Sequence, residues 1–253
     1  MRQVNCKSLL LPLLLAFAHV ASAAIAIGGN TSGGGYGSSV TTTGITTQAS
    51  GSTYYAVWIS TGTFGTGAVS DSSSNTWVHS VNNVSFSGAL RHIDVWTCQS
   101  CAGGSGHTFT FNPQNGGAYV YFFIEVTGAA TSSLDQNQNA MGSGGGTSIS
   151  TTSVTTTSAS ELVLAMLAVT NDVTLSAPTS SFTLGTAQQD GGNGSESAAW
   201  AYRVVSATGT YSTSFTVSSS GQDYASVVMS FIQAGGGGGG SQGQGGFAGS
   251  PSN

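Results

Sequence analysis

Charged residues are scarce in this sequence: Asp, Glu, Lys and Arg together make up 5% of its 253 residues. Nine are acidic and four are basic, so the formal net charge at pH 7 is −5. Nucleic acids and anionic membrane surfaces are bound by clusters of Lys and Arg. Because the chain is too poor in basic residues to form such a cluster, we expect no nucleic-acid partner.

Sustained helical periodicity is also missing. Short runs rich in Val, Ile, Thr, Tyr and Phe alternate instead with clusters of Gly, Ser, Asn and Asp. This pattern is typical of strands joined by tight turns. We therefore predict an all-β protein, an antiparallel two-sheet β-sandwich of jelly-roll-like architecture.

The N-terminus has the pattern of a secretory signal peptide. Arg2 and Lys7 precede and flank the start of an apolar run, Leu9–Ala18, and Ala21-Ser22-Ala23 forms an A-x-A cleavage site. We predict a signal peptide at residues 1–23 and a secreted or cell-surface protein. The apolar run is shorter than a membrane helix requires, and no later run replaces it, so we predict no membrane span.

An internal repeat divides the rest of the chain. Ser100–Val126 aligns without gaps to Ser206–Ile232, which places Phe109 on Phe215. We predict two related halves, at about 31–128 and 146–234. They are expected to form one sandwich over residues 40–234, because neither half has many bulky apolar residues and no clear linker divides them. If there were two sandwiches, Met141–Gly146 would be the best candidate for the hinge.

Two flanking segments are rich in glycine. Residues 24–39 contain many Gly and Ser residues, and residues 235–253 open with six consecutive glycines. Such composition is typical of flexible linkers and tails. We predict a flexible N-terminal segment at 24–39 and a disordered tail at 235–253.

Four stretches carry a resemblance to a known group of proteins: AVSDSSSNTWVHS, SASELVLAMLAV, YRVVSATGTYSTSFTVSSS and YASVVMSFI. They resemble uncharacterised bacterial and phage extracellular β-sandwich modules, over most of residues 31–233. The resemblance implies a β-sandwich fold and an extracellular location. It brings no catalytic motif and no site residues.

The stretch HIDVWTCQSCAGGSGH, residues 92–107, holds the two cysteines that remain after signal cleavage. A zinc site would need His92, which on an extended strand lies about 20 Å from Cys98. A redox pair is usually placed at a helix N-terminus, and no helix is expected here. We therefore favour a Cys98–Cys101 disulfide, which suits a secreted chain, and predict no metal site and no cofactor.

Catalytic patterns are weak. The G-x-S-x-G match at residues 239–243 lies in the glycine tail, without the strand and helix that a nucleophile elbow needs. Asp94 and Glu125 are the acids within strand-like runs, and a glycosidase needs two such carboxyl groups about 5–10 Å apart. Asp71–Asn75 alternates oxygen ligands but has one charge, so it is a weak calcium candidate. We expect turn-capping or paired roles for these acids, and no enzyme activity.

The aromatic residues suggest a binding role. The repeat aligns Trp96 with Tyr202 and Trp58 with Leu164, and positions that are bulky in both halves are expected in the core. The better candidates for a sugar-stacking platform are other aromatics: Trp200, Tyr119, Tyr121 and Tyr211, together with Tyr36. We predict a secreted non-catalytic protein that binds an extracellular glycan or cell-surface component. The alternatives are a self-associating structural subunit of an appendage, matrix or particle surface, and, third, a glycan-active enzyme.

Overall fold

The computed structural model describes residues 23–61, 68–192 and 196–235. Residues 1–22 of the predicted signal peptide lie outside the described residues, as do the G-x-S-x-G match and the glycine tail beyond Gly235. In the described part, every regular element is a β-strand, and the strands pair in antiparallel fashion. The all-β prediction is confirmed.

The strands divide into more sheets than the two that we predicted. A first five-stranded sheet has the order β1-β8-β3-β6-β5, and a second has the order β14-β15-β12-β18-β9. The first comprises β1 (Ala26–Gly37), β8 (Gly117–Thr127), β3 (Ser52–Ser60), β6 (Arg91–Cys101) and β5 (Val78–Phe86). The second comprises β14 (Thr183–Gln189), β15 (Glu196–Val205), β12 (Glu161–Thr170), β18 (Gln222–Gln233) and β9 (Ala129–Gly145).

Three small sheets accompany the two large ones. Their orders are β2-β7-β4, β10-β17-β13 and β11-β16. The first is formed by β2 (Val40–Thr41), β7 (Phe109–Asn112) and β4 (Ala68–Asp71). The other two are formed by β10 (Ser148–Ser150), β17 (Ser214–Val217), β13 (Leu175–Ser176), β11 (Val154–Thr155) and β16 (Thr210–Tyr211).

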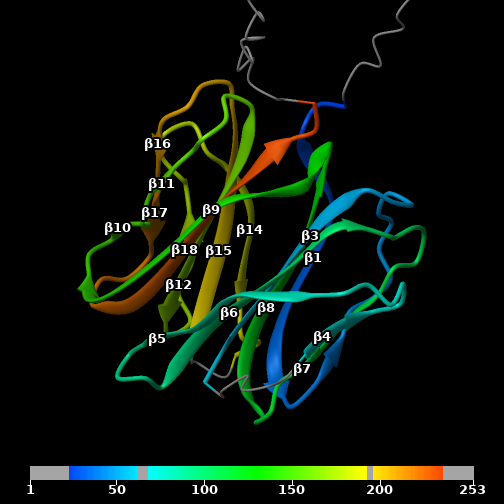
Figure 1. Ribbon diagram of the computed structural model, residues 1–253. Helices are drawn as coiled ribbons and strands as arrows, with labels where there is room; N and C mark the ends of the chain where they lie inside the picture. Colours follow the sequence, from blue (N-terminus) through cyan, green and yellow to red (C-terminus); the bar gives the residue numbers. More distant parts are fainter. Residues whose placement is uncertain (1–22, 62–67, 193–195, 236–253) are drawn as a thin grey trace, which may run out of the picture.

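Three hydrophobic clusters show how the sheets are stacked. The largest joins residues of both five-stranded sheets, which therefore face each other, as Figure 1 shows. A second cluster lies between the first sheet and β2-β7-β4, and a third between the second sheet and the strands β10, β11, β13 and β17. The central strands β3 and β12 are consequently buried along their whole length. This double cover explains why their sequences are apolar on both faces.

The two large sheets have the same strand order when β9 is matched with β1 and β18 with β8. The pairing also corrects the alignment of the repeat. Val40 lies opposite Phe111, and Ile149 lies opposite Phe215, so Phe111 rather than Phe109 corresponds to Phe215. Because side chains alternate between faces with a period of two, a slip of two residues leaves the hydrophobic pattern unchanged and escapes detection in the sequence.

The glycine-rich segment that we predicted to be flexible is β1, a twelve-residue strand paired with β8. Its glycines allow close packing. A Cβ atom on Gly33 would meet the ring of Tyr121, and one on Gly34 would meet the backbone oxygen of Gln189 in the second sheet. Met141–Gly146 is not a hinge either, because residues up to Gly145 belong to β9. The strands of the second sheet thus begin at Ala129 rather than at residue 146.

The first and last described residues meet at one end of the molecule. Gln233 Nε2 donates to the backbone oxygen of Ala23 at 3.4 Å, and Ala234 N donates to that of Gly128 at 2.8 Å. β12 starts at this end, where Glu161 pairs with Ile232. The opposite end, here called the distal end, is formed by residues 85–91, 141–143, 171–174, 187–192 and 222–223.

Candidate functional site

Trp200, a predicted platform residue, lies inside the protein. Its side chain is 2% exposed and belongs to the core between the two large sheets, with its ring 5.9 Å from that of Tyr202. On β15 it shares a face with Ala198, and this face is turned toward the first sheet. A ring enclosed in this way cannot stack on a sugar, so this prediction is wrong.

Tyr119 and Tyr121 are also enclosed, because β2-β7-β4 covers their face of β8. Both are 9% exposed. The ring of Tyr119 stacks on that of Trp58 at 4.5 Å, and the ring of Tyr121 lies 5.5 Å from that of Phe111. Sequence alternation placed the two tyrosines on one face correctly, but it gave no sign that a small sheet covers that face.

Tyr211 lies in the other half of the chain, on β16. Its hydroxyl donates to the backbone oxygen of Ala207 at 2.7 Å, and the Arg203 guanidinium lies 5.2 Å from its ring centre. It is half-buried. The predicted platform residues Trp200, Tyr119, Tyr121 and Tyr211 are therefore not gathered into one surface.

The disulfide between Cys98 and Cys101 is present, as predicted. The flanking histidines are not metal ligands beside it. His92 Nδ1 lies 3.1 Å from the hydroxyl of Ser85, and His107 Nδ1 lies 3.1 Å from that of Thr47. In the part of the chain that the structure describes, no group of three or more His, Cys, Asp or Glu side chains is placed to hold a metal ion.

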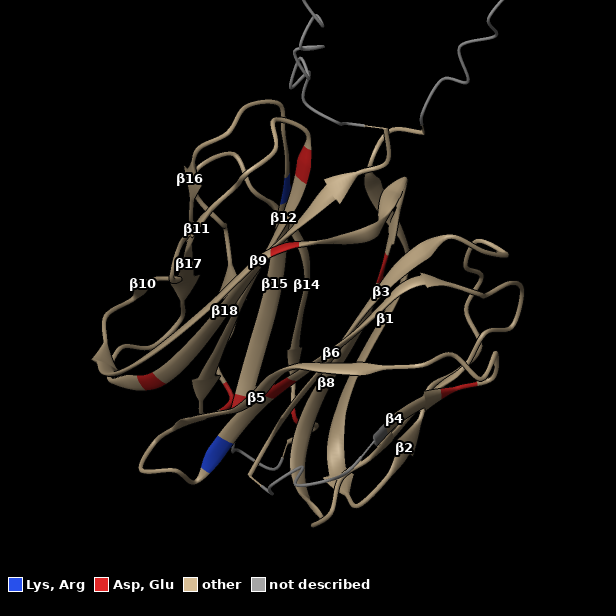
Figure 2. Ribbon diagram, in the orientation of Figure 1, with Lys and Arg blue, Asp and Glu red and all other residues tan. Residues whose placement is uncertain are grey.

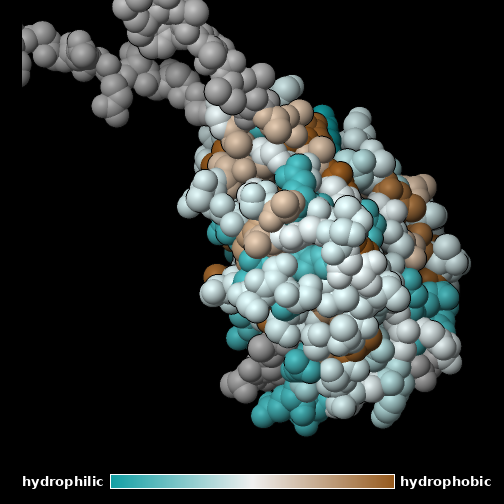
Figure 3. Space-filling model, turned by 90° about the vertical axis from the view of Figure 1, so that its right-hand side faces the viewer, coloured by the Kyte–Doolittle hydropathy of each residue, from teal (hydrophilic) through white to brown (hydrophobic). Residues whose placement is uncertain are grey.

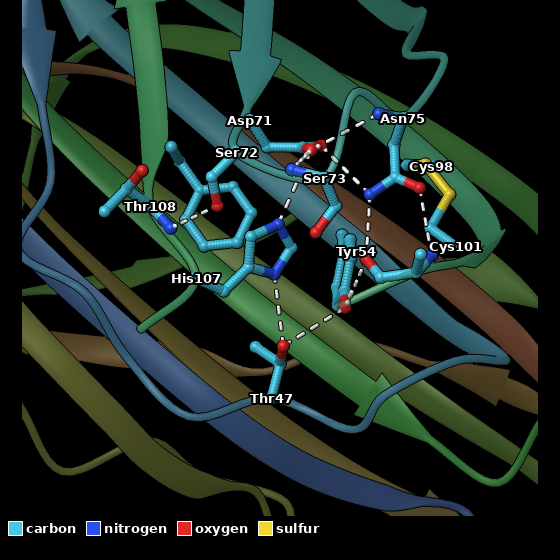
Figure 4. A network of polar contacts seen from close by, with 12 residues as sticks. Thr47, Tyr54, Asp71, Ser72, Ser73, Asn75, Cys98, Cys101, His107 and Thr108 are labelled. Carbon is cyan, nitrogen blue, oxygen red and sulfur yellow. Dashed lines mark hydrogen bonds and ion pairs between the residues drawn. A yellow bond between two sulfur atoms is a disulfide. The ribbon is translucent and has the colours of Figure 1, made fainter. Parts of the chain in front are cut away.

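Asp71 is the centre of a polar network next to the disulfide (Figure 4). Its Oδ1 accepts from the backbone N of Ser73 at 2.8 Å, and its Oδ2 accepts from Trp77 Nε1 at 2.8 Å and from Asn75 Nδ2 at 3.1 Å. Protein donors therefore occupy both oxygens. Asp71 caps a turn, as we expected for the turn acids, and has no oxygen left for calcium.

His107 extends this network into a hydroxyl–imidazole–carboxylate chain. Its Nε2 lies 3.5 Å from Asp71 Oδ1, and its Nδ1 faces the Thr47 hydroxyl. The order is that of a nucleophile, base and orienting acid. However, His107 is 2% exposed, Thr47 is 7% exposed, and the Thr47 hydroxyl also accepts from Gly104 N at 3.0 Å. An enclosed, saturated hydroxyl cannot attack a substrate, so the network serves to hold the loop after the disulfide against β4.

Asp94 and Glu125 lie too far apart for glycoside hydrolysis. They flank β3 on opposite sides, Asp94 beside Trp58 and Glu125 beside Tyr54. The four-residue step along β3 alone separates them by about 13 Å, which exceeds the spacing of either glycosidase class. The pairing thus contradicts the assignment of these two acids as a catalytic pair.

Each of these two acids has its own protein partners. Asp94 Oδ1 accepts from the backbone N of Asn83 and lies 2.9 Å from His79 Nε2, while burial raises the pKa of this carboxyl group. Glu125 accepts from Gly29 N at 2.8 Å and from Gln48 N at 2.7 Å. Both acids are 1% exposed. Their observed role is to hold backbone segments together.

Two pockets open at the distal end instead. The first, here called the Asp172 pocket, has a volume of about 400 Å³. Polar side chains, two glycines and a short apolar wall line it: Asp172, Val173, Thr174, Leu175, Ala187, Gln188, Gln189, Gly191 and Gly192. Asp172, Thr174 and Gln189 bring a carboxylate, a hydroxyl and an amide to this space together with aliphatic carbon, whereas the Gln188 amide lies toward the first sheet, where its Oε1 accepts from the Ser32 hydroxyl at 3.5 Å.

The second, the Asp223 pocket, has a volume of about 440 Å³ and lies between the β5–β6 turn and β9. Three consecutive residues of that turn, Ser87, Gly88 and Ala89, have φ values of 55°, 66° and 63°. Met141, 58% exposed, contributes an apolar side chain. Its hydrogen-bonding lining residues are three serines and Asp223, with no side-chain amide.

A buried acidic group lies near the Asp172 pocket. Glu196 is fully buried, and its pKa is raised to about 8 by burial first, then by Asp190 and Asp172, against the opposing effect of Arg91. Our sequence reasoning missed Glu196. The sequence did contain an indication of it: Glu196 lies two and four residues before Ala198 and Trp200, so the three side chains share one face of β15, and this face is turned toward the core.

No family model, curated protein or solved structure matches this chain. The resemblance to extracellular β-sandwich modules therefore remains an expectation from the sequence. Among the described residues there is no helix long and apolar enough to cross a membrane.

Proposed function

We propose that this chain is a secreted, non-catalytic β-sandwich protein that binds a neutral extracellular glycan at its distal end. The Asp172 pocket carries this proposal. Carboxylate and amide side chains form paired hydrogen bonds with neighbouring hydroxyl groups, and small-molecule sites combine a few such groups with an apolar wall. Asp172, Thr174 and Gln189 supply the polar groups, and Val173 and Leu175 supply the wall.

The position of the pocket suits a protein attached through its flanking segments. Ala23 and Ala234 lie at the other end of the sheets. The pocket would therefore remain accessible if either flank joined the protein to a surface or to another domain. The predicted signal peptide and the disulfide support an extracellular location.

The absence of catalysis is part of the same proposal. The candidate acids Asp94 and Glu125 lie on opposite sides of β3, and the Thr47 hydroxyl beside His107 is enclosed. A pocket of this size with one carboxylate suits the binding of one or two sugar units without cleavage.

Binding is tested with the secreted, processed protein on a glycan array and on insoluble polysaccharides. We expect selective retention that falls at least tenfold in Asp172→Asn and in Gln189→Ala. Gln138→Ala is the matched control, because Gln138 is exposed on β9, at the opposite edge of the same sheet. Equal retention by all four proteins, or retention by none, would overturn the assignment of this pocket.

A structural or adhesive subunit is the second candidate. Hydroxyl side chains pair across the small sheets: Thr41 with Thr110 at 2.8 Å, Ser150 with Ser214 at 2.8 Å and Thr155 with Thr210 at 2.9 Å. Figure 3 shows one side of the molecule, where hydrophilic and weakly polar residues dominate. Sedimentation at increasing concentration tests this candidate: a strictly monomeric protein would remove it.

A further inference from the structure

Thr170 and Gln222 are hydrogen-bonded at the distal ends of two neighbouring strands. Thr170 is the last residue of β12, and Gln222 is the first residue of β18. The Thr170 hydroxyl donates to Gln222 Oε1 at 2.9 Å, and the two residues are 7% and 4% exposed. A hydroxyl group and a primary amide are thus held together with little access to water.

The amide carbonyl of Gln222 has a second donor. Asn171 Nδ2 donates to the same Oε1 at 2.9 Å, so two hydrogen bonds converge on one carbonyl oxygen. Asn171 has a φ of 64°, the left-handed conformation that Asn adopts more readily than most side-chain-bearing residues. Two donors on one oxygen stabilise the negative charge that develops there when a nucleophile attacks the carbonyl carbon.

A carboxyl group lies on the other side of Thr170. In the second sheet, β12 lies between β15 and β18, and Thr170 pairs with Glu196 of β15. Directly paired residues point to the same face, with Cβ atoms about 5 Å apart. Neither carboxyl oxygen of Glu196 has a hydrogen-bond partner in the protein, although the side chain is fully buried; Arg91 Nε forms an ion pair with Oε2 at 3.7 Å, which is too long for a hydrogen bond. Buried polar groups normally have partners, so an unsatisfied carboxyl group here requires an explanation.

We propose that Thr170 and Gln222 form an intramolecular ester cross-link, with Glu196 as the proton carrier. The Thr170 oxygen attacks the Gln222 side-chain carbonyl carbon and forms a C–O bond, while the C–N bond of the amide breaks. The protonated carboxyl group of Glu196 gives its proton to the departing nitrogen and takes up the proton of the Thr170 hydroxyl, so Glu196 ends in the state in which it began. Ammonia leaves, and no oxidant, reductant or cofactor is required.

The cross-link would join two central strands where the sheet ends. β12 and β18 are separated by more than 50 residues that include the loops of the Asp172 pocket. The chain has a single lysine, Lys7, which lies within the predicted signal peptide. After removal of the predicted signal peptide the protein has no lysine that could form an isopeptide bond, whereas a threonine can form an ester.

Intact-protein mass spectrometry of the secreted, processed protein tests this proposal. We expect a mass about 17 Da below that of the processed sequence with its disulfide, because one ammonia is lost. Proteolysis should yield one linked pair of peptides, containing Thr170 and Gln222, that hydroxylamine separates. Thr170→Val should restore the full mass, whereas Thr170→Ser, which keeps a hydroxyl nucleophile, should retain the loss.

Glu196→Gln distinguishes the proposed role of Glu196 from a merely structural one. This variant keeps the size of the side chain but cannot carry the proton, so we expect the folded variant to have the full mass. A wild-type protein that is folded and has the full mass would overturn the cross-link. A 17 Da loss that persists in Thr170→Val would overturn its assignment to this pair.

Discussion

Arg91 and Glu196 connect the two large sheets: Arg91 Nε on β6 lies 3.7 Å from Glu196 Oε2 on β15. Charged residues are few in this protein, and Figure 2 shows them as scattered coloured segments. The contact joins one of the two described arginines to a fully buried acid. Arg91 lowers the pKa of Glu196, but burial and the neighbouring acids Asp190 and Asp172 have a larger, opposite effect and raise this pKa to about 8. Glu196 is therefore largely neutral at pH 7.

This raised pKa predicts a pH dependence of stability. Glu196 binds its proton more tightly in the folded state than in the unfolded state, whose reference pKa is 4.5. Its contribution is fully present below pH 4.5 and is lost as the pH rises to about 8. The free energy of unfolding should fall by up to about 1.4 kcal/mol for each pH unit within this window.

Glu196→Gln should remove that slope, because glutamine does not titrate. Urea unfolding of both proteins at pH 5, 6, 7 and 8 gives the difference in their free energies of unfolding. Taking this difference cancels the contributions of other titrating groups, such as Asp94 and Glu161. If the two proteins showed parallel curves, Glu196 would not titrate in this range.

The sequence was sufficient for the fold class, because alternation with a period of two is a local property of each strand. It was not sufficient for the layers. Apolar side chains on both faces of a strand such as β12 indicate that both faces are covered, but they do not indicate which strands cover them. This is why Tyr119 and Tyr121 were predicted as surface groups: their partners Trp58 and Phe111 come from strands whose packing depends on the whole fold.

The candidate site was less predictable than the fold. The Asp172 pocket combines residues 172–175 with residues 187–192, and no spacing in the sequence brings them together. The disulfide was predictable because its two cysteines are neighbours in the chain. Thr170 and Gln222 are 52 residues apart, so only the pairing of β12 with β18 reveals their contact.

The disulfide should contribute little to stability. Cys98 and Cys101 are separated by 3 positions in the sequence, and the entropy lost on closing such a short loop corresponds to about 2 kcal/mol. The double variant Cys98→Ser/Cys101→Ser should therefore fold and unfold cooperatively, with a loss of about 2 kcal/mol or less in chemical denaturation. A variant that fails to fold would show that the bridge holds the neighbouring Asp71 network as well.

Gly34 should be intolerant of any side chain. A Cβ atom there would meet the backbone oxygen of Gln189, and backbone of the second sheet cannot move aside easily. We expect Gly34→Ala to lower the free energy of unfolding by about 1–3 kcal/mol, the range for overpacking. Gly37→Ala on the same strand is the control, because its Cβ would meet only the Tyr119 ring, at 3.9 Å. Equal losses in both variants would contradict a specific contact at Gly34.

Trp200→Ala tests whether Trp200 stabilises the core or binds a ligand. Removing a buried tryptophan leaves a cavity between the two sheets, so we expect a loss of about 3–5 kcal/mol in the free energy of unfolding. Tyr36→Ala, at a side chain that is 72% exposed, should change stability by about 0.5 kcal/mol or less. Thermal and urea unfolding measure both. A Trp200→Ala protein with wild-type stability but impaired glycan retention would restore Trp200 as a binding residue and contradict its burial.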